Sequence, residues 1–295
     1  MGAHRVGAGD QILIEEIGLP TAVYVCPDCK TLLLDLSCSA CGSQYGVRDG
    51  IPILLPSDPR FRAASGIAAA YDSIYRGHSN VWENQGRTPQ FLEYFSSLLG
   101  RFPCTRFLEI GCGEGLLLSR LVKGEKFATD LSIEALKRAR KTTSAHLTVA
   151  LAERLPFPSA HFDLIASVGV MEHFLDIDEA TSEICRTLRS GGYYVALTHV
   201  DLTLWNRLGQ KVSDYLFPRP RLLQLARWLR ARPGPGTKPG LVKQPIQHRY
   251  TIREAKACLR RYPLRVVDVL RARRPPRPPL DPWAVIYIAE RRDRQ

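Results

Sequence analysis

Short apolar runs alternate with segments of helical spacing along residues 105–200. The runs are rich in β-branched and aromatic side chains and have the length of buried strands. The predicted strands are 105–110, 126–130, 146–150, 162–168 and 193–200. The predicted helices among them are 115–122, 132–141 and 178–189. Strands that alternate with helices in this way indicate an α/β fold with a doubly wound parallel sheet.

Further elements flank this core. Residues 60–100 are mostly helical in spacing and end at Gly100. Residues 251–262 predict a helix, and 264–270 and 283–290 predict two closing strands.

A separate module precedes these elements. Residues 1–20 form an extension, and residues 21–56 contain four cysteines. The stretch "YGVRDGIPILLP" that follows the cysteines has two strand-like runs around an Asp-Gly turn signal. We therefore predict two domains, 1–58 and 59–295.

The composition is that of a globular protein, with 45% apolar and 24% charged residues. We find no apolar run near the roughly 18 residues that a membrane span needs. Two glutamates interrupt "QILIEEIGLP" near the N-terminus, so this region does not resemble a signal peptide. We therefore expect a cytoplasmic protein without a transmembrane segment.

The basic charge is concentrated in the last third. Residues 201–295 hold 22 lysines and arginines against 7 acidic residues, whereas the first 200 hold 19 against 22. This excess favours an anionic partner such as RNA, a phosphate-bearing substrate or a membrane surface. Residues 201–247 interrupt the α/β order, and we expect them to form a lid. Their predicted helix has an apolar face formed by Leu204, Leu208, Val212 and Tyr215.

A glycine loop follows the first strand of the core. "EIGCGEG" carries Gly111 and Gly113, where the backbone can turn sharply and approach a ligand. The helix predicted after it offers free N–H groups. Asp130 ends the next strand, where a carboxylate can accept hydrogen bonds from both hydroxyls of a ribose. Glu109 precedes the loop, and a carboxylate there suits an amino group better than the pyrophosphate of a dinucleotide.

Four stretches then resemble a known family. "FLEIGCGEG", "TDLS", "AERLPFPSAHFDLIASVGVMEH" and "CRTLRSGGYYVAL" are similar in order and spacing to class I S-adenosylmethionine-dependent methyltransferases. The branch that they resemble is the methyltransferase type 11 group, which includes the quinone-biosynthesis enzymes. The resemblance is strong over 90–200 and weak over 248–290. It implies a Rossmann-like, seven-stranded methyltransferase sheet and S-adenosyl-L-methionine as cofactor.

The resemblance also implies cofactor-binding residues. Glu109 and the backbone of the glycine loop would hold the methionine end, and Asp130 would hold the ribose. Leu131 would pack on the adenine, and the Ala152 N–H would meet a ring nitrogen. The complete set of candidates is Glu109, Gly111, Cys112, Gly113, Asp130, Leu131, Ala152, Glu153 and Val168.

One position departs from the family. Leu151 stands where the family usually has Asp, which accepts a hydrogen bond from the adenine amino group. We therefore expect Glu153 or a backbone carbonyl to take that role.

The acceptor side follows the fourth strand of the core. Its residues are "GVMEHF", in which His173 is a candidate base because its ordinary pKa lies near working pH. Glu172 is a second candidate, and His173 also suits a purely structural role in the loop. His248, Arg249 and Tyr250 are expected to line the acceptor pocket. The Asn-Pro-Pro-Tyr stretch of many adenine, cytosine and glutamine methyltransferases is missing here, which argues against those acceptors.

The front module carries a metal-binding pattern. Cys26, Cys29, Cys38 and Cys41 form two CxxC pairs, the spacing of two zinc knuckles. Four thiolates make a closed tetrahedral site, so the predicted zinc is structural. The module resembles the zinc-ribbon activator subunit of eukaryotic RNA and release-factor methyltransferases, which leaves substrate binding and bracing of the catalytic domain as its two candidate roles.

Three functions remain open from the sequence. The first is methyl transfer to a small-molecule or lipid-linked acceptor, at oxygen or carbon, and the apolar lid favours it. The second is RNA base methylation of the rRNA type, which the ribbon and the basic last third favour. The third is a non-catalytic, cofactor-binding module that supports a partner. Peripheral contact of the lid with a membrane is compatible with the first.

Overall fold

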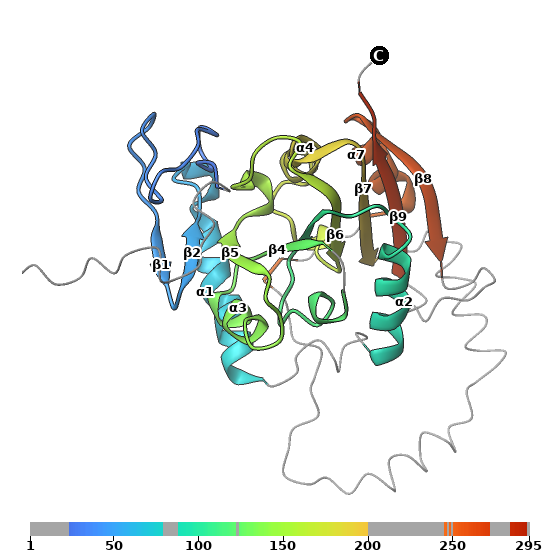
Figure 1. Ribbon diagram of the computed structural model, residues 1–295, viewed down its shortest axis with the longest axis horizontal. Helices are drawn as coiled ribbons and strands as arrows, with labels where there is room; N and C mark the ends of the chain where they lie inside the picture. The colour runs from blue at the N-terminus through green and yellow to red at the C-terminus, as the bar shows by residue number, and fades with distance from the viewer. Residues whose placement is uncertain are drawn as a thin grey trace, which may run out of the picture.

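A computed structural model describes residues 24–78, 88–121, 124–199, 245–246, 248, 250–271 and 284–293. Within these residues a single sheet runs in the order β1-β2-β5-β4-β3-β6-β7-β9-β8 (Figure 1). The strands are β1 (Gly46–Arg48), β2 (Ile51–Leu54), β3 (Arg106–Ile110), β4 (Glu125–Asp130), β5 (His146–Ala150), β6 (Phe162–Val168), β7 (Leu188–His199), β8 (Leu264–Arg271) and β9 (Ala284–Arg291).

The sheet has nine strands, so the expectation of seven was too low. Seven of them, β5-β4-β3-β6-β7-β9-β8, form the methyltransferase-like part of the sheet. The other two come from the stretch after the cysteines, because β2 pairs in parallel with β5 and β1 pairs antiparallel with β2. The predicted Asp-Gly turn joins β1 and β2, with positive φ at both Asp49 and Gly50 as a tight hairpin requires.

Helices cover both faces of the sheet (Figure 1). The helices are α1 (Ala63–Gly77), α2 (Pro89–Leu99), α3 (Ile133–Ala139), α4 (Ile177–Thr187) and α7 (Ile252–Arg260). One core cluster joins apolar residues of α4 and α7 to the sheet and includes residues of the cysteine segment. A second cluster joins α2 and α3 to the opposite face. This arrangement confirms the predicted α/β class. The sheet is mixed and not wholly parallel as predicted, because β9 runs antiparallel to both β7 and β8.

One predicted helix was wrong. Residues 115–122 contain only the single 3-10 turn η4 (Leu118–Arg120) among the described positions. Leu121 takes an extended backbone directly after it, with ψ of 127°, and packs against the α2 side of the core. So short a segment gains little from its own hydrogen bonds, and tertiary packing decides its conformation.

The lid lies outside the described residues, except for Pro245 and Ile246. Among the described helices, none combines the length and the apolarity of a membrane span.

Candidate active site and cysteine cluster

The glycine loop leaves the carboxyl end of β3 with a left-handed backbone at Gly111, whose φ is +67°. A Cβ atom built at Gly111 would lie 2.5 Å from Cγ2 of Val170, which no real contact allows. The loop therefore packs directly against the segment that follows β6. Glycine is required here by both the backbone conformation and the space.

Asp130, at the end of β4, holds this loop in place. Its Oδ2 accepts a hydrogen bond from Gly113 N–H at 2.9 Å, and its Oδ1 accepts from Ser132 N–H at 2.9 Å. One carboxylate thus binds both the loop that follows β3 and the turn that follows β4. Asp130 lies beside the glycine loop at the carboxyl end of β4, as the sequence predicted.

Glu109 is fully buried near the end of β3. Its strand neighbours in register are Ala128 on β4 and Ala166 on β6, both small and buried. Together with Asp130 it places two carboxylates beside one glycine loop. Two hydrogen-bond acceptors of this kind suit a ligand with an ammonium group and a diol, and S-adenosylmethionine has both.

Cys112 and Val168 take a different place from the other cofactor candidates. Both side chains are buried in the core cluster on the α2 and α3 face. Only the backbone at these positions is left to face a ligand.

The residues predicted to meet the adenine lie beside an apolar cluster. Leu151 is buried and packs with Phe61, just before α1, and with Ala64 in its first turn. The half-buried Leu131 and Leu175 pack against them. The leucine that replaces the family's Asp thus completes a hydrophobic wall. Sequence reasoning missed Phe61, Ala64 and Leu175, because contacts between distant segments leave no local signal in the chain.

Glu153 is buried in the short helix η5 (Ala152–Arg154), next to the backbone of Ala152. Its Oε1 accepts hydrogen bonds from Leu175 N–H at 2.6 Å and Asp176 N–H at 3.1 Å. Burial raises the pKa of Glu153 to about 7, although these N–H groups lower it. The Glu153 carboxyl group thus binds the backbone of the two residues that precede α4.

Glu172 lies in the short helix η6 (Met171–His173), directly after β6. Its Oε2 accepts from the Thr198 hydroxyl at 2.8 Å, and its Oε1 accepts from the His199 Nδ1 at 2.8 Å. Burial pushes the pKa of Glu172 upward. The hydrogen bond and charge of His199, with further help from His173, outweigh this effect and hold the pKa below its usual value.

His173 faces a different partner. Its Nδ1 bonds the carbonyl oxygen of Ile246. The backbone carbonyl of Glu172 accepts from His248 N–H at 2.7 Å. The η6 turn is therefore hydrogen-bonded to both Ile246 and His248. Burial lowers the pKa of His173, which keeps its imidazole neutral at neutral pH.

His199 was missed by the sequence analysis. It ends β7 beside β6, and its side chain is 48% exposed, against 3% for Glu172. A histidine at the end of a parallel strand was the available signal, since the carboxyl ends of such strands line the ligand crevice.

Tyr71 of α1 is a second residue that the sequence did not single out. Burial raises the pKa of its hydroxyl, and the negative charges of Asp130 and Glu172 add to this. Tyr71 therefore lies within electrostatic reach of both the ribose side and the acceptor side of the site.

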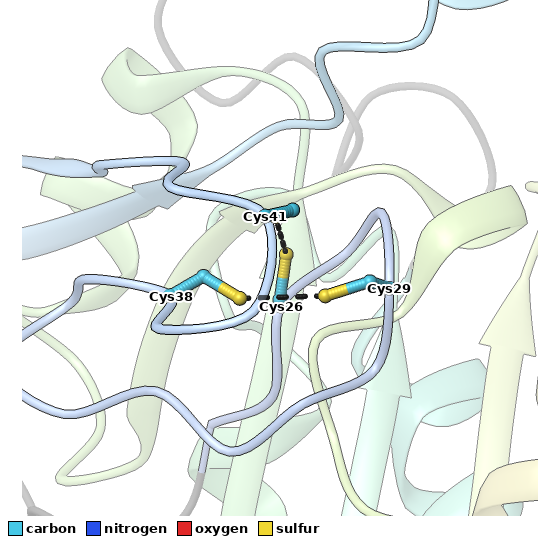
Figure 2. Close-up of side chains that lie close together, drawn as sticks. All are labelled: Cys26, Cys29, Cys38 and Cys41. Atoms are coloured by element: carbon cyan, nitrogen blue, oxygen red, sulfur yellow. Dashed lines mark hydrogen bonds between the residues drawn. The ribbon is translucent and has the colours of Figure 1, made fainter.

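The four predicted cysteine ligands come together in the segment that precedes β1 (Figure 2). Their Sγ atoms all lie within 4.8 Å of one another. The distances are 3.6 Å from Cys26 to Cys41 and 3.3 Å from Cys29 to Cys38. Four sulfurs about 2.3 Å from a zinc ion would be about 3.8 Å apart, so the set fits that ion.

The two CxxC turns have the same backbone structure. Lys30 N–H donates to Cys26 O at 2.9 Å, and Gly42 N–H donates to Cys38 O at 3.0 Å. Lys30 and Gly42 also share a positive φ, of 66° and 75°. Two equivalent turns that point their thiols at one another are what a pair of zinc knuckles requires.

The central segment has known relatives. Residues 108–196, which hold the glycine loop, Asp130 and the turn after β6, match the family described as a methyltransferase domain. This match supports the methyltransferase resemblance of the central segment.

Two curated proteins are similar to this domain. The ubiquinone biosynthesis O-methyltransferase of Chelativorans sp. is 31% identical over 126 residues, which cover 40% of this chain and 47% of that protein. The malonyl-[acyl-carrier protein] O-methyltransferase of Enterobacter lignolyticus is 37% identical over 103 residues, covering 32% of this chain and 41% of that protein. The chain thus spans less than half the length of either protein.

A solved structure shares the fold. In a complex between the Haloferax volcanii Trm112 methyltransferase activator and a methyltransferase, one chain matches with a TM-score of 0.53 and 16% identity. The match covers 78% of this chain and 99% of that chain.

Proposed function

We propose that this protein transfers the methyl group of S-adenosylmethionine to a small-molecule or lipid-linked acceptor. One observation carries the proposal. Glu109, one residue before the end of β3, and Asp130, at the end of the adjacent parallel strand β4, lie on either side of the glycine loop in the chain, inside the segment that matches the methyltransferase family. The relatives named above are O-methyltransferases of small or carrier-linked substrates. Oxygen is the acceptor atom that this similarity favours, with carbon as the second choice.

Each candidate cofactor residue has a role in this proposal. Glu109 would bind the ammonium group of the methionine end and Asp130 the ribose hydroxyls. Leu131 and Leu151 would exclude water from the adenine, with the Ala152 N–H directed at its ring. S-adenosylmethionine, when bound, supplies an electrophilic methyl group on a sulfonium. The protein then has to align an acceptor with it at the edge formed by the ends of β3, β6 and β7.

We also propose that Cys26, Cys29, Cys38 and Cys41 bind one structural zinc ion, and that the ribbon braces the methyltransferase domain. The cysteine segment shares a core with that domain. Tyr24, Cys26, Leu33 and Cys38 are buried in the same cluster as residues of α4 and α7.

Polar contacts support this brace. Val25 N–H donates to Pro156 O at 3.0 Å, and Lys30 Nζ donates to Glu183 Oε2 of α4 at 2.6 Å. The Lys30 ammonium also reaches Leu155 O at 3.4 Å. These contacts hold the loop that follows Ala152 and Glu153. A metal that orders the ribbon would therefore also order the adenine side of the site.

The predicted division at residue 58, the lid, a cytoplasmic location, membrane contact and an RNA acceptor remain predictions. The RNA alternative depends on the basic last third, much of which lies outside the described residues. A supporting, non-catalytic role is the other alternative.

One experiment separates these functions. The purified full chain is incubated with a cell extract and S-adenosylmethionine labelled in the methyl group, and the extract is then fractionated into small molecules and lipid, RNA and protein. Label in the small-molecule and lipid fraction supports the proposal, provided that Asp130→Ala abolishes it. Label in RNA, with an affinity that falls steeply between about 50 and 200 mM salt, would establish the alternative. No label in any fraction would leave the supporting role.

A further inference from the structure

We infer that Glu172 and His199 form a general-base pair for a methyl acceptor whose reacting oxygen carries a proton, an alcohol or a phenol. The inference rests on the proposed function and deepens it, because it names the class of acceptor. It starts from the 2.8 Å bond between His199 Nδ1 and Glu172 Oε1.

This bond fixes the imidazole tautomer. A carboxylate oxygen accepts hydrogen bonds, so Nδ1 of the neutral imidazole has to carry the proton. The lone pair then lies on Nε2, the nitrogen at the far side of the ring. With 48% of its side chain exposed, His199 is accessible at the end of β7. The same division of labour between a buried carboxylate and an imidazole operates in the catalytic triads of hydrolases.

Three hydrogen-bond donors stabilise the ionised form of the buried Glu172 carboxylate. Thr198 O–H and the backbone N–H of His199 donate to it, at 2.8 Å and 3.3 Å, in addition to the imidazole. A positive charge that forms on His199 would therefore meet a fixed negative charge. Among the described residues, the titratable groups around this pair are His173, His248, Tyr71, Tyr194 and Tyr250.

The pair lies beside the cofactor loop. Val170, two residues before Glu172, fills the space against which Gly111 packs. Strands β6 and β7 pair in parallel up to Val168 and Leu197, so His199 and the glycine loop lie at the same edge of the sheet. The charges of Asp130 and Glu172 both raise the pKa of Tyr71, so Tyr71 lies near Asp130 as well as near the pair.

The chemistry of this step balances as follows. The acceptor oxygen forms a bond to the methyl carbon with one of its lone pairs, and the S–C bond breaks with its electrons left on sulfur. The hydroxyl proton moves to His199 Nε2, and the imidazolium later releases it to water. The products are a methyl ether and S-adenosylhomocysteine.

The pair also discriminates between oxygen acceptors. A carboxylic acid is already ionised at neutral pH and needs no base. An alcohol or phenol keeps its proton at that pH, so its oxygen gains nucleophilicity when the proton is taken during the transfer. His173 fits this role less well. Its Nδ1 partner is a neutral backbone carbonyl instead of a carboxylate, and burial lowers the pKa of its imidazole, which disfavours the imidazolium that a base has to form.

NMR of the full chain with 15N-labelled histidine tests the pair without any acceptor. The signals of His199 are identified by their loss in His199→Gln. We expect a protonated Nδ1 and an unprotonated Nε2 in the neutral form. In Glu172→Gln the midpoint of the His199 titration should fall by about one pH unit or more, because the charge that stabilises the imidazolium is gone. Thr198→Val is the matched control, because it removes another donor to the same carboxylate and keeps its charge. Its midpoint should move much less.

A second measurement tests the use of the pair in transfer. His199→Gln should lower label transfer to the accepting extract fraction by about 10²–10⁴-fold. Its affinity for S-adenosylhomocysteine should stay within about threefold of wild type. A proton on Nε2 in the neutral form, an unmoved midpoint in Glu172→Gln, or full transfer by His199→Gln would each overturn the inference. The proposed function fails separately, if the wild type binds S-adenosylhomocysteine but labels no fraction.

Discussion

The hydroxyl of Tyr24 lies 2.8 Å from the hydroxyl of Thr148, and both residues are buried. This bond joins the residue two positions before the first cysteine to the middle of β5. Two positions after Ala150, the end of β5, the chain reaches Ala152, the residue that we propose contacts the adenine. The metal-binding segment and the cofactor site are therefore connected through one strand.

Zinc removal should consequently destabilise the whole methyltransferase domain. We expect one zinc per chain by elemental analysis of untagged protein. Cys41→Ser, at an exposed ligand position, should lose the metal and lower the free energy of unfolding by several kcal/mol, because metal binding is linked to folding. Thermal unfolding followed by circular dichroism should show a single transition that moves to lower temperature.

Cys104→Ser is the matched control, since Cys104 lies outside the cluster. It should keep the zinc. An unchanged unfolding temperature in metal-free Cys41→Ser would contradict the bracing role, and native protein without zinc would contradict the metal site itself.

The Asp130 carboxylate should contribute directly to cofactor affinity. Asp130→Ala should weaken binding of S-adenosylhomocysteine by roughly 1–3 kcal/mol in calorimetry, because charge-assisted hydrogen bonds to the ribose are lost. The same change removes the acceptor of Gly113 N–H and Ser132 N–H, so a part of the loss reflects the loop.

Asp130→Asn separates the two effects, because it keeps an acceptor oxygen for the loop and removes the charge. The affinity of Asp130→Asn for S-adenosylhomocysteine should lie between the affinities of wild type and Asp130→Ala. Tighter binding of NAD than of S-adenosylhomocysteine would contradict the cofactor assignment.

Local patterns were sufficient to predict most of the fold. Strand 162–168 has the bounds that hydrophobicity indicated, because its residues are buried on both faces. The pairing of β2 with β5 had no such signal, since it joins residues about a hundred positions apart through only two residue pairs. His199 is similar: its pattern is that of a strand end, and its partner Glu172 is found only when β6 and β7 are placed side by side.

Gly111 offers a test of the loop geometry. Gly111→Ala should destabilise the protein by about 2–4 kcal/mol, the sum of a left-handed backbone and a side chain forced against Val170. Adding Val170→Ala should recover the steric part and leave the backbone part, which urea unfolding of the single and double variants can separate.

Gly66→Ala provides the reference for this comparison. Gly66 lies in α1 with no atom within 4 Å of a built Cβ, so the change should stabilise the helix by roughly 0.5–1 kcal/mol. Equal effects of Gly111→Ala with and without Val170→Ala would show that the contact is unimportant.

Glu153 makes a prediction about pH. Burial raises its pKa from an ordinary 4.5 to about 7 in the folded state, so the folded protein binds a proton more tightly than the unfolded chain between these values. Stability from this group is therefore present at low pH and lost as the pH rises from about 4.5 to about 7. Glu153→Gln has no titrating group and should escape this loss. The difference in unfolding free energy between Glu153→Gln and wild type should thus grow with pH by about 3 kcal/mol over that window.

Urea unfolding at a series of pH values measures this difference, with Glu93→Gln on the exposed side of α2 as the control. A difference that shrinks with rising pH would mean that the N–H groups of Leu175 and Asp176 outweigh burial and hold Glu153 ionised.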